Sequence, residues 1–170
     1  KVLCKQILSY HRIPTPRFAV FARNKLIRPQ RKLKYPLLVK SVFEEASLGI
    51  TRDSIVHNHA QLVDRVLRVH EELNTDALVE EFIEGREFYV GVMGNQRLQT
   101  FPVWELLFRN LPEHIPNIAT ARVKWDIEYQ KELGVMTQAV TDLPDSRIRK
   151  IIKLCKRIYR VLYLSGYARI

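Results

Sequence analysis

The apolar residues along the chain predict three helices and a series of short strands. Leucine, isoleucine and valine recur at helical spacing over 1–11, 58–73 and 145–164, and the last pattern is the strongest. Apolar runs bounded by glycine, proline or polar residues predict strands at 17–22, 35–40, 97–104 and 166–170. A shorter alternation predicts one more strand at 120–125, with Arg122 and Lys124 facing the same way.

The stretch 78–92 is the centre of this pattern. An apolar run ends in Glu80 and Glu81, Gly85 marks a turn, and a second run opens with Glu87, which together predict a β-hairpin. Charged groups resist burial, so carboxylates at strand ends are costly unless something binds them. A nucleotide held at a strand edge would use them. A hairpin with solvated acids fits the pattern equally well.

Two loops carry the other candidate chemistry. The strand at 35–40 ends in Lys40, and the loop Ser41–Gly49 that follows has hydroxyl groups and one glycine, as phosphate-binding loops do. The GxxxxGK[ST] order of a P-loop is absent. The segment Glu105–Val123 contains two prolines and no clear period, which predicts a long loop that is either a functional lid or simply mobile.

Composition narrows the choice of class. The 170 residues are 46% hydrophobic, enough for one core or for two small lobes that share a cleft. Twenty-eight Lys and Arg against 18 Asp and Glu give a net charge of +10, which suits phosphate-bearing ligands or nucleic acid but also simple solubility. The basic runs at 28–34 and 147–160 lack the interleaved aromatic residues of a single-strand binder.

Cysteine usage and the chain ends bear on location and completeness. Cys4 and Cys155 form no CxxC motif or metal-ligand spacing, so two reduced thiols in a cytoplasmic protein are expected. No apolar run approaches the roughly 18 residues of a membrane span. The chain does not begin with Met, and a helical pattern starts at its first residue. A strand pattern begins at 166–170, where the sequence stops. These features predict that the chain is part of a longer polypeptide.

Taken in order, these features resemble the ATP-grasp superfamily, and within it the D-alanine–D-alanine ligase-like branch. The resemblance covers nearly the whole chain, and it is the order and spacing of its pieces that make it specific. The pieces are Lys1 and Lys5 before Ile13-Pro14-Thr15-Pro16, Leu38-Val39-Lys40 before Ser47-Leu48-Gly49, Val79-Glu80-Glu81-Phe82-Ile83 before Gly85-Arg86-Glu87-Phe88, and Gly166-Tyr167-Ala168-Arg169-Ile170.

The resemblance implies an α+β ATP-grasp fold, in which two α+β subdomains flank a nucleotide cleft that is incomplete at the C-terminal end. Residues 1–83 would form the small subdomain, and residues 84–170 the first part of the large one. Family members activate a carboxylate as an acyl phosphate, which an amine then attacks.

The resemblance also implies roles for single residues. Lys40, with Lys1 as a second candidate, would neutralise the α- and β-phosphates of ATP, and the loop with Ser47 and Gly49 would close over them. Glu80 and Glu87 would hold the adenine amino group and the ribose hydroxyls. The main-chain groups of Glu81 and Ile83 would frame the adenine edge. Lys124 would lie near the transferred phosphoryl group, and Arg169 would steady the acyl phosphate as the second catalytic residue.

Two departures from the family pattern limit this expectation. The loop sequence Glu44-Glu45-Ala46-Ser47-Leu48-Gly49 is poorer in small residues than the usual form, which puts one hydroxyl contact in doubt. The carboxylates and asparagine that bind Mg²⁺ are expected beyond residue 170, so no metal ligand is assigned here and the fragment alone should be inactive.

The hypothesis is therefore an ATP-dependent carboxylate–amine ligase, with ATP, Mg²⁺, a small carboxylate and an amine acceptor as its partners. A non-catalytic nucleotide-binding regulatory module is the alternative, and a basic nucleic-acid-binding domain ranks last because only the net charge favours it. No membrane association is expected, and a homodimer stays open.

Overall fold

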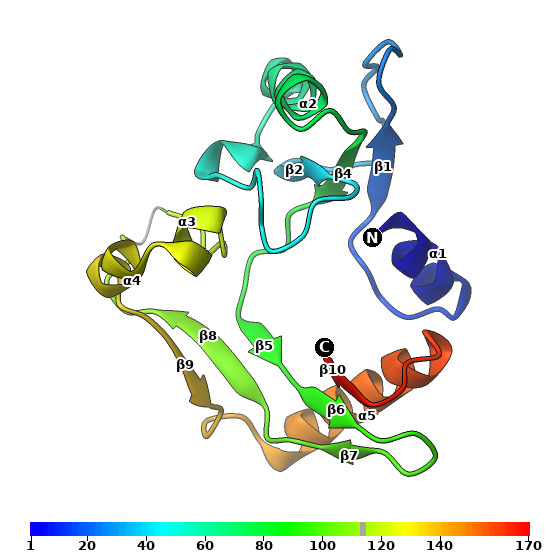
Figure 1. The fold of residues 1–170 in the computed structure, drawn as a ribbon, viewed down its shortest axis with the longest axis vertical. Coiled ribbons are helices and arrows are strands. Elements are labelled where there is room, and N and C mark those ends of the chain that lie inside the picture. Colours follow the sequence, from blue (N-terminus) through cyan, green and yellow to red (C-terminus); the bar gives the residue numbers. More distant parts are fainter. Residues whose placement is uncertain (113–114) are drawn as a thin grey trace. The chain divides into compact units, whose positions relative to one another are not determined.

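The computed structural model describes residues 1–112 and 115–170, which form two compact units (Figure 1). The described residues of the first unit are Lys1–Val2, Pro16–Glu84 and 115–131. The second is made of Leu3–Thr15, Gly85–Pro112 and Glu132–Ile170. Each unit therefore draws on segments that are distant in sequence. The assignment of 1–83 and 84–170 as ATP-grasp subdomains stays a prediction.

The first unit is a four-stranded antiparallel sheet with one long helix, α2 (His59–Glu72), packed on it (Figure 1). In spatial order its strands are β1 (Phe18–Phe21), β4 (Ala77–Glu81), β2 (Leu37–Ser41) and β3 (Ile55–Val56). The short helix η1 (Arg52–Ser54) precedes β3, and α3 (Ala121–Trp125) lies in the same unit. The helix α4 (Ile127–Leu133) runs across the division between the units.

Side-chain alternation in β2 and β4 separates a core face from a second face. Leu37 and Val39 of β2 and Val79 of β4 are buried in the core with the stripe that α2 presents. That stripe contains Leu62, Val66 and Val69, as the helical spacing predicted. Successive side chains of a strand point to opposite faces, so the residues next to these in β2 and β4 lie on the other face. Lys40 and Glu80 are among them.

The helix predicted at 58–73 is confirmed as α2, with Asn58 as the cap before its first residue, His59. The side chain of Asn58 accepts a hydrogen bond from the backbone N–H of Gln61 (2.9 Å), which caps the helix. The side chain of Gln61 accepts in return from the backbone N–H of His57 (2.7 Å), one residue before the cap.

The second unit contains two three-stranded antiparallel sheets, α1 (Val2–Tyr10, apart from its first residue) and α5 (Asp145–Val161). One sheet has the order β10 (Tyr167–Arg169), β6 (Gly91–Met93), β7 (Gln99–Thr100), and the other β5 (Glu87–Tyr89), β8 (Trp104–Phe108), β9 (Val135–Ala139). Cys155 and Tyr159 of α5 are buried against Val90, Val92 and Val103. The helix predicted at 145–164 and the strand at 166–170 are confirmed.

The hairpin predicted at 78–92 is wrong. Strand β4 pairs with β1 and β2 in the first unit, whereas β5 pairs with β8 in the second. The two runs belong to different units, and each pairs with strands of its own unit. Short-range pattern identifies strands, but it does not identify the partner of each strand.

Two further strand predictions need correction. The stretch 97–104 contains β7 and only the first residue of β8, which continues to Phe108, so Glu105 lies inside a strand and does not open a loop. The rest of the predicted loop Glu105–Val123 includes residues 113 and 114, which lie outside the described residues. The stretch 120–125 is not a strand but the helix α3, capped by the Thr120 side chain, which accepts from the Val123 N–H (3.2 Å).

Candidate functional site

Lys40 and Glu80 form an ion pair on the face of the first unit's sheet that is opposite to α2. In the β2–β4 register, Lys40 lies opposite Leu78 and Glu80 lies opposite Leu38, so the two charged side chains are diagonal neighbours on one face. Their side chains are only 19% and 9% exposed. The predicted phosphate lysine and the predicted adenine carboxylate are therefore partners of each other.

Lys1 joins this pair. Its ammonium group donates to the carbonyl oxygens of Ser41 (3.0 Å) and Glu44 at the start of the loop Ser41–Gly49. Burial lowers the pKa of Lys1; the nearby Lys40 ammonium acts in the same direction, and the Glu45 carboxylate opposes it. We call Lys1, Lys40 and Glu80 the lysine cluster, because it brings two positive charges and one negative charge to the end of β2.

The loop Ser41–Gly49 is held at both ends by its own polar groups. The hydroxyl of Ser41 accepts from the backbone N–H groups of Phe43 (3.1 Å) and Glu44 (3.0 Å). The hydroxyl of Ser47 donates to the carbonyl of Ala119 (2.6 Å), just before α3. Ser47, which was expected to close over phosphates, therefore joins this loop to the segment that leads into α3.

Gly49, the glycine of this loop, lies against the side chain of Leu73. Its φ of +72° is left-handed, and a Cβ atom there would lie 2.5 Å from Cδ1 of Leu73. The structure thus gives Gly49 a conformational and packing role at the end of the loop, beside any contact with a ligand.

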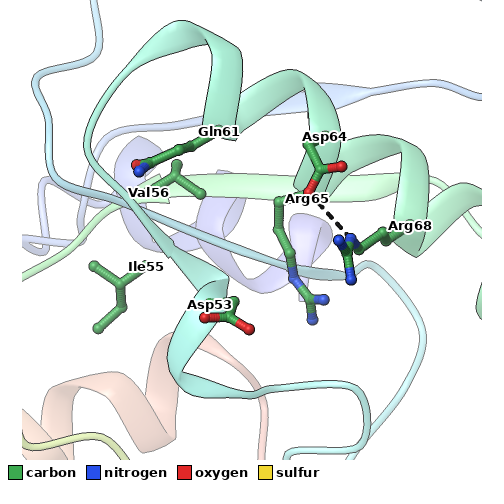
Figure 2. Close-up of a pocket in the computed structure, with 7 residues that line it drawn as sticks. All are labelled: Asp53, Ile55, Val56, Gln61, Asp64, Arg65 and Arg68. Carbon is green, nitrogen blue, oxygen red and sulfur yellow. Dashed lines mark hydrogen bonds and ion pairs between the residues drawn. The ribbon is translucent and has the colours of Figure 1, made fainter.

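Arg65 of α2 fixes the same end of the loop, and sequence reasoning missed it. Figure 2 shows its side chain reaching from α2 toward η1, beside Asp53. The guanidinium donates to the Gly49 carbonyl and to the Ser54 hydroxyl (3.0 Å), and the residue is only 7% exposed. Burial lowers the pKa of Arg65, and the carboxylates of Glu72 and Asp53 oppose this.

The signal for Arg65 was present in the helical spacing. Arg65 is three residues after Leu62 and one before Val66, so it falls on the buried face of α2. A charged residue on a buried face requires partners. The guanidinium lines a pocket of about 220 Å³, together with Asp53, Ile55, Val56, Gln61, Asp64 and Arg68 (Figure 2).

The adenine-framing residues lie at the end of β4. The backbone N–H of Glu81 donates to the carbonyl of Arg17 (2.9 Å), and its carboxylate accepts from the backbone N–H of Lys34 (3.0 Å). An adenine contact through the main chain of Glu81 would therefore use its carbonyl oxygen. Ile83 follows β4 with an exposed side chain.

Lys124 is an exposed residue of α3 in the first unit. Because α3 is a helix, positions two apart point about 200° from one another. The prediction that Arg122 and Lys124 share one face is therefore wrong. Arg122 pairs with Asp126 (2.9 Å) and lies over the ring of Tyr129 (3.9 Å to its centre). The available signal for a helix was Thr120, a residue type whose hydroxyl caps helices by accepting from the backbone N–H three residues later.

Glu87 and Arg169 belong to the second unit and share one neighbour, Tyr89. The Tyr89 hydroxyl donates to the Glu87 carboxylate, and the Arg169 guanidinium lies over the Tyr89 ring, 5.0 Å from its centre. Burial, followed by the hydrogen bond to Glu87, raises the pKa of the Tyr89 hydroxyl. The tyrosine therefore stays neutral and links the two predicted site residues.

A buried carboxylate network beside Glu87 is a second feature that sequence reasoning missed. Glu105 of β8 is 3% exposed, and Arg86 binds both of its oxygens through Nε (2.6 Å) and Nη2 (2.5 Å). Arg86 also binds both oxygens of Asp142 (3.0 and 2.9 Å). A carboxylate between Val103 and Leu106 in an apolar run was the available signal.

Metal ligands are not found in this part of the chain. Residues 1–112 and 115–170 contain no group of three or more His, Cys, Asp or Glu side chains placed to hold a metal ion. Within the same residues, no helix is both long and apolar enough to cross a membrane. Both cysteines are free thiols, and burial raises the pKa of Cys155.

Comparison with known proteins identifies the family. A model of the family described as D-ala D-ala ligase C-terminus matches residues 7–170. An uncharacterized protein of Sinorhizobium fredii is 33% identical over 129 residues, covering 76% of this chain and 35% of that protein. The D-alanine–D-alanine ligase of Pediococcus pentosaceus is 29% identical over 173 residues, covering 100% of this chain and 44% of that protein.

Solved structures agree on the fold. The D-alanine–D-alanine ligase from Bacillus anthracis, complexed with ATP, superimposes with a TM-score of 0.73 at 21% identity, over 99% of this chain and 48% of that one. The chain thus spans less than half the length of the relatives described here. Its fold is the α+β ATP-grasp fold, and the chain belongs to the D-ala D-ala ligase C-terminal family.

Proposed function

We propose that this chain is the ATP-binding part of an ATP-dependent ligase that joins a small carboxylate to an amine. The family match over 7–170 carries the proposal. The lysine cluster supports it, because two half-buried ammonium groups lie near each other at the end of β2 and the start of the loop Ser41–Gly49. The relatives named D-alanine–D-alanine ligases make D-alanine the first carboxylate and the first amine to test.

The residues fit ATP by charge. Lys40 and Lys1 would neutralise the α- and β-phosphates as compact ammonium charges, with Lys40 exchanging its partner Glu80 for a phosphate oxygen. Glu80 would then accept a hydrogen bond from the adenine amino group. ATP would supply the phosphoryl group that activates the carboxylate.

Other residues would hold the nucleotide and protect the activated carboxylate. The loop with Ser47 and Gly49 would exclude water, which hydrolyses acyl phosphates. Glu87 would bind the ribose hydroxyls, and the main chain of Glu81 and Ile83 the adenine edge. Lys124 would approach the transferred phosphoryl group, and Arg169 would stabilise the developing negative charge on the acyl phosphate.

Mg²⁺ would act together with ATP, and its ligands would lie outside residues 1–170. Among the described residues, no group of three or more His, Cys, Asp or Glu side chains is placed to hold a metal ion. We further propose that the ligase acts in the cytoplasm, where both thiols would stay reduced.

ADP release by the full-length protein tests the function. The assay contains ATP, Mg²⁺ and each of a series of small carboxylates, with and without amine acceptors. We expect ADP release that requires both the carboxylate and ATP, and that falls in Lys40→Met. Intact ATP binding with no ADP release for any carboxylate and acceptor pair would instead favour the non-catalytic nucleotide-binding module.

A further inference from the structure

A second pocket lies within the second unit and is walled mainly by aromatic side chains. It has a volume of about 290 Å³ and is lined by Tyr89, Gly91, Phe101, Trp104, Thr137, Tyr167 and Arg169. The strand registers explain why these residues meet. Tyr89 lies opposite Trp104 in the β5–β8 pair, and Arg169 lies opposite Gly91 in the β10–β6 pair, so each pair shares one face.

Gly91 provides the room for the aromatic walls. A Cβ atom at this position would lie 2.9 Å from Cδ2 of Phe101 and 3.1 Å from Cε2 of Tyr167. The backbone N–H of Phe101 donates to the Gly91 carbonyl (2.9 Å), and the rings of Phe101 and Tyr167 meet edge to face at 6.2 Å. The absence of a side chain at Gly91 thus lets the two rings stand over one strand.

Charge in this pocket is concentrated on one residue. Arg169 is the one lining side chain that is charged at neutral pH, and Tyr89 lies beneath its guanidinium and is itself tied to Glu87. A guanidinium recognises carboxylates through two parallel hydrogen bonds. Aromatic walls favour planar or bulky apolar groups, which bury well against ring faces and edges.

We propose that this pocket holds the carboxylate substrate, and that this substrate carries an aromatic or bulky apolar side chain. The inference rests on the proposed function and deepens it by naming the substrate class. The carboxylate lies at Arg169, and the side chain lies among Phe101, Trp104 and Tyr167. About 290 Å³ is near the small end of ligand pockets, so the occupant is the size of an amino acid rather than of a nucleoside triphosphate.

Trp104 gives a direct measurement, because it lines the pocket. The full-length protein is titrated without ATP with 3-phenylpropanoate and with propanoate, and tryptophan fluorescence is followed. We expect 3-phenylpropanoate to bind at least about tenfold more tightly and to change the fluorescence. Trp104→Phe should lose that change, whereas Trp125→Phe, in α3 of the first unit, should keep it.

Two matched substitutions separate the pocket from general effects. Tyr167→Ala should weaken 3-phenylpropanoate binding at least about fivefold, with propanoate unchanged. Tyr163→Ala, an exposed tyrosine of the same unit that does not line the pocket, should change neither. Equal affinity for the two acids, or no loss in Tyr167→Ala, would overturn the inference. Tighter quenching by AMP than by 3-phenylpropanoate would overturn it in favour of a nucleotide site.

This titration and the ADP-release assay together separate this inference from the proposed function. ADP release with D-alanine as readily as with phenyl-bearing carboxylates would leave the ligase proposal standing and end this one. Selective binding of 3-phenylpropanoate that depends on Tyr167, with no ADP release for any carboxylate, would support the pocket and count against the ligase.

Discussion

At the residue scale, Gly49 allows a test of the loop's end. Gly49→Ala should destabilise the protein for two reasons: left-handed backbone costs a non-glycine residue about 1–2 kcal/mol, and the end of the Leu73 side chain must move aside, which adds a smaller cost. Gly166 is the matched control, because its φ is +73° but a Cβ there would meet nothing within 4 Å. Urea unfolding should show a larger loss for Gly49→Ala than for Gly166→Ala. Equal losses would mean that Leu73 moves aside freely.

Arg65 gives the second prediction at this scale. Arg65→Met should lower the free energy of unfolding by about 1.5–3 kcal/mol, because it removes charge-assisted hydrogen bonds to the Gly49 carbonyl and the Ser54 hydroxyl. Arg68→Met, one turn along the same helix, removes only an exposed pair with Asp64 and should cost about 0.3–0.5 kcal/mol. A similar cost for both, measured by urea unfolding, would remove the anchoring role of Arg65.

The sequence identified single candidate residues from their place in a local pattern, but it did not predict which residues they contact. Lys40 at a strand end and Glu80 in an apolar run were identified as candidates, but their pairing needs the β2–β4 register, which depends on distant segments. Arg65 and Glu105 were missed, although each is a charged residue at a position that the local period makes buried. A charged residue at a position that the local period predicts to be buried is therefore a signal for a structural or functional site, as a motif is.

At the element scale, the spacing of apolar residues predicted correctly whether a segment is a helix or a strand, except where the segment is short. The long patterns of α2 and α5 were confirmed, because many positions agree with one period. The five-residue helix α3 was predicted as a strand, since so short a stretch fits both periods and only the Thr120 cap decides. The hairpin at 78–92 failed because local turn signals say nothing about competing partner strands.

The Arg86 network predicts a pH effect at this scale. The Arg86 side-chain hydrogen bonds hold the pKa of Asp142 below its ordinary value of 3.8, so the folded state binds fewer protons than the unfolded state in this range. Its stabilisation is complete above the ordinary value and is lost as the pH falls through the lowered pKa. Asp142→Asn should therefore lose less stability than the wild type between about pH 5 and pH 2.

A double substitution checks the cause. In an Arg86→Met background, Asp142→Asn should no longer flatten the pH dependence of the free energy of unfolding, because the group that lowers the pKa is gone. An unchanged effect of Asp142→Asn in that background would assign the pH dependence to another group.

At the scale of the whole molecule, each compact unit has its own core. One core is built on α2 and the four-stranded sheet, the other on α5 and the strands around Val90 and Val92. Length and composition allowed either one core or two lobes, and only the structure decides. The lysine cluster has two positive charges and one negative charge, so most of the net charge of +10 comes from residues outside the place where a phosphate-binding role is proposed.

Lys40→Met tests that role in the full-length protein. ATP binding measured by calorimetry should weaken at least about tenfold, because a compact ammonium charge in a half-buried position is lost. Lys25→Met, an exposed lysine of the same unit, lowers the net charge equally and should leave ATP affinity within about twofold. Glu80→Gln in the Lys40→Met background removes the former ion-pair partner and should reduce adenine preference over guanine without restoring affinity. Unaltered ATP binding in Lys40→Met would show that another residue holds the phosphates, and an equal loss in Lys25→Met would reduce the effect to overall charge.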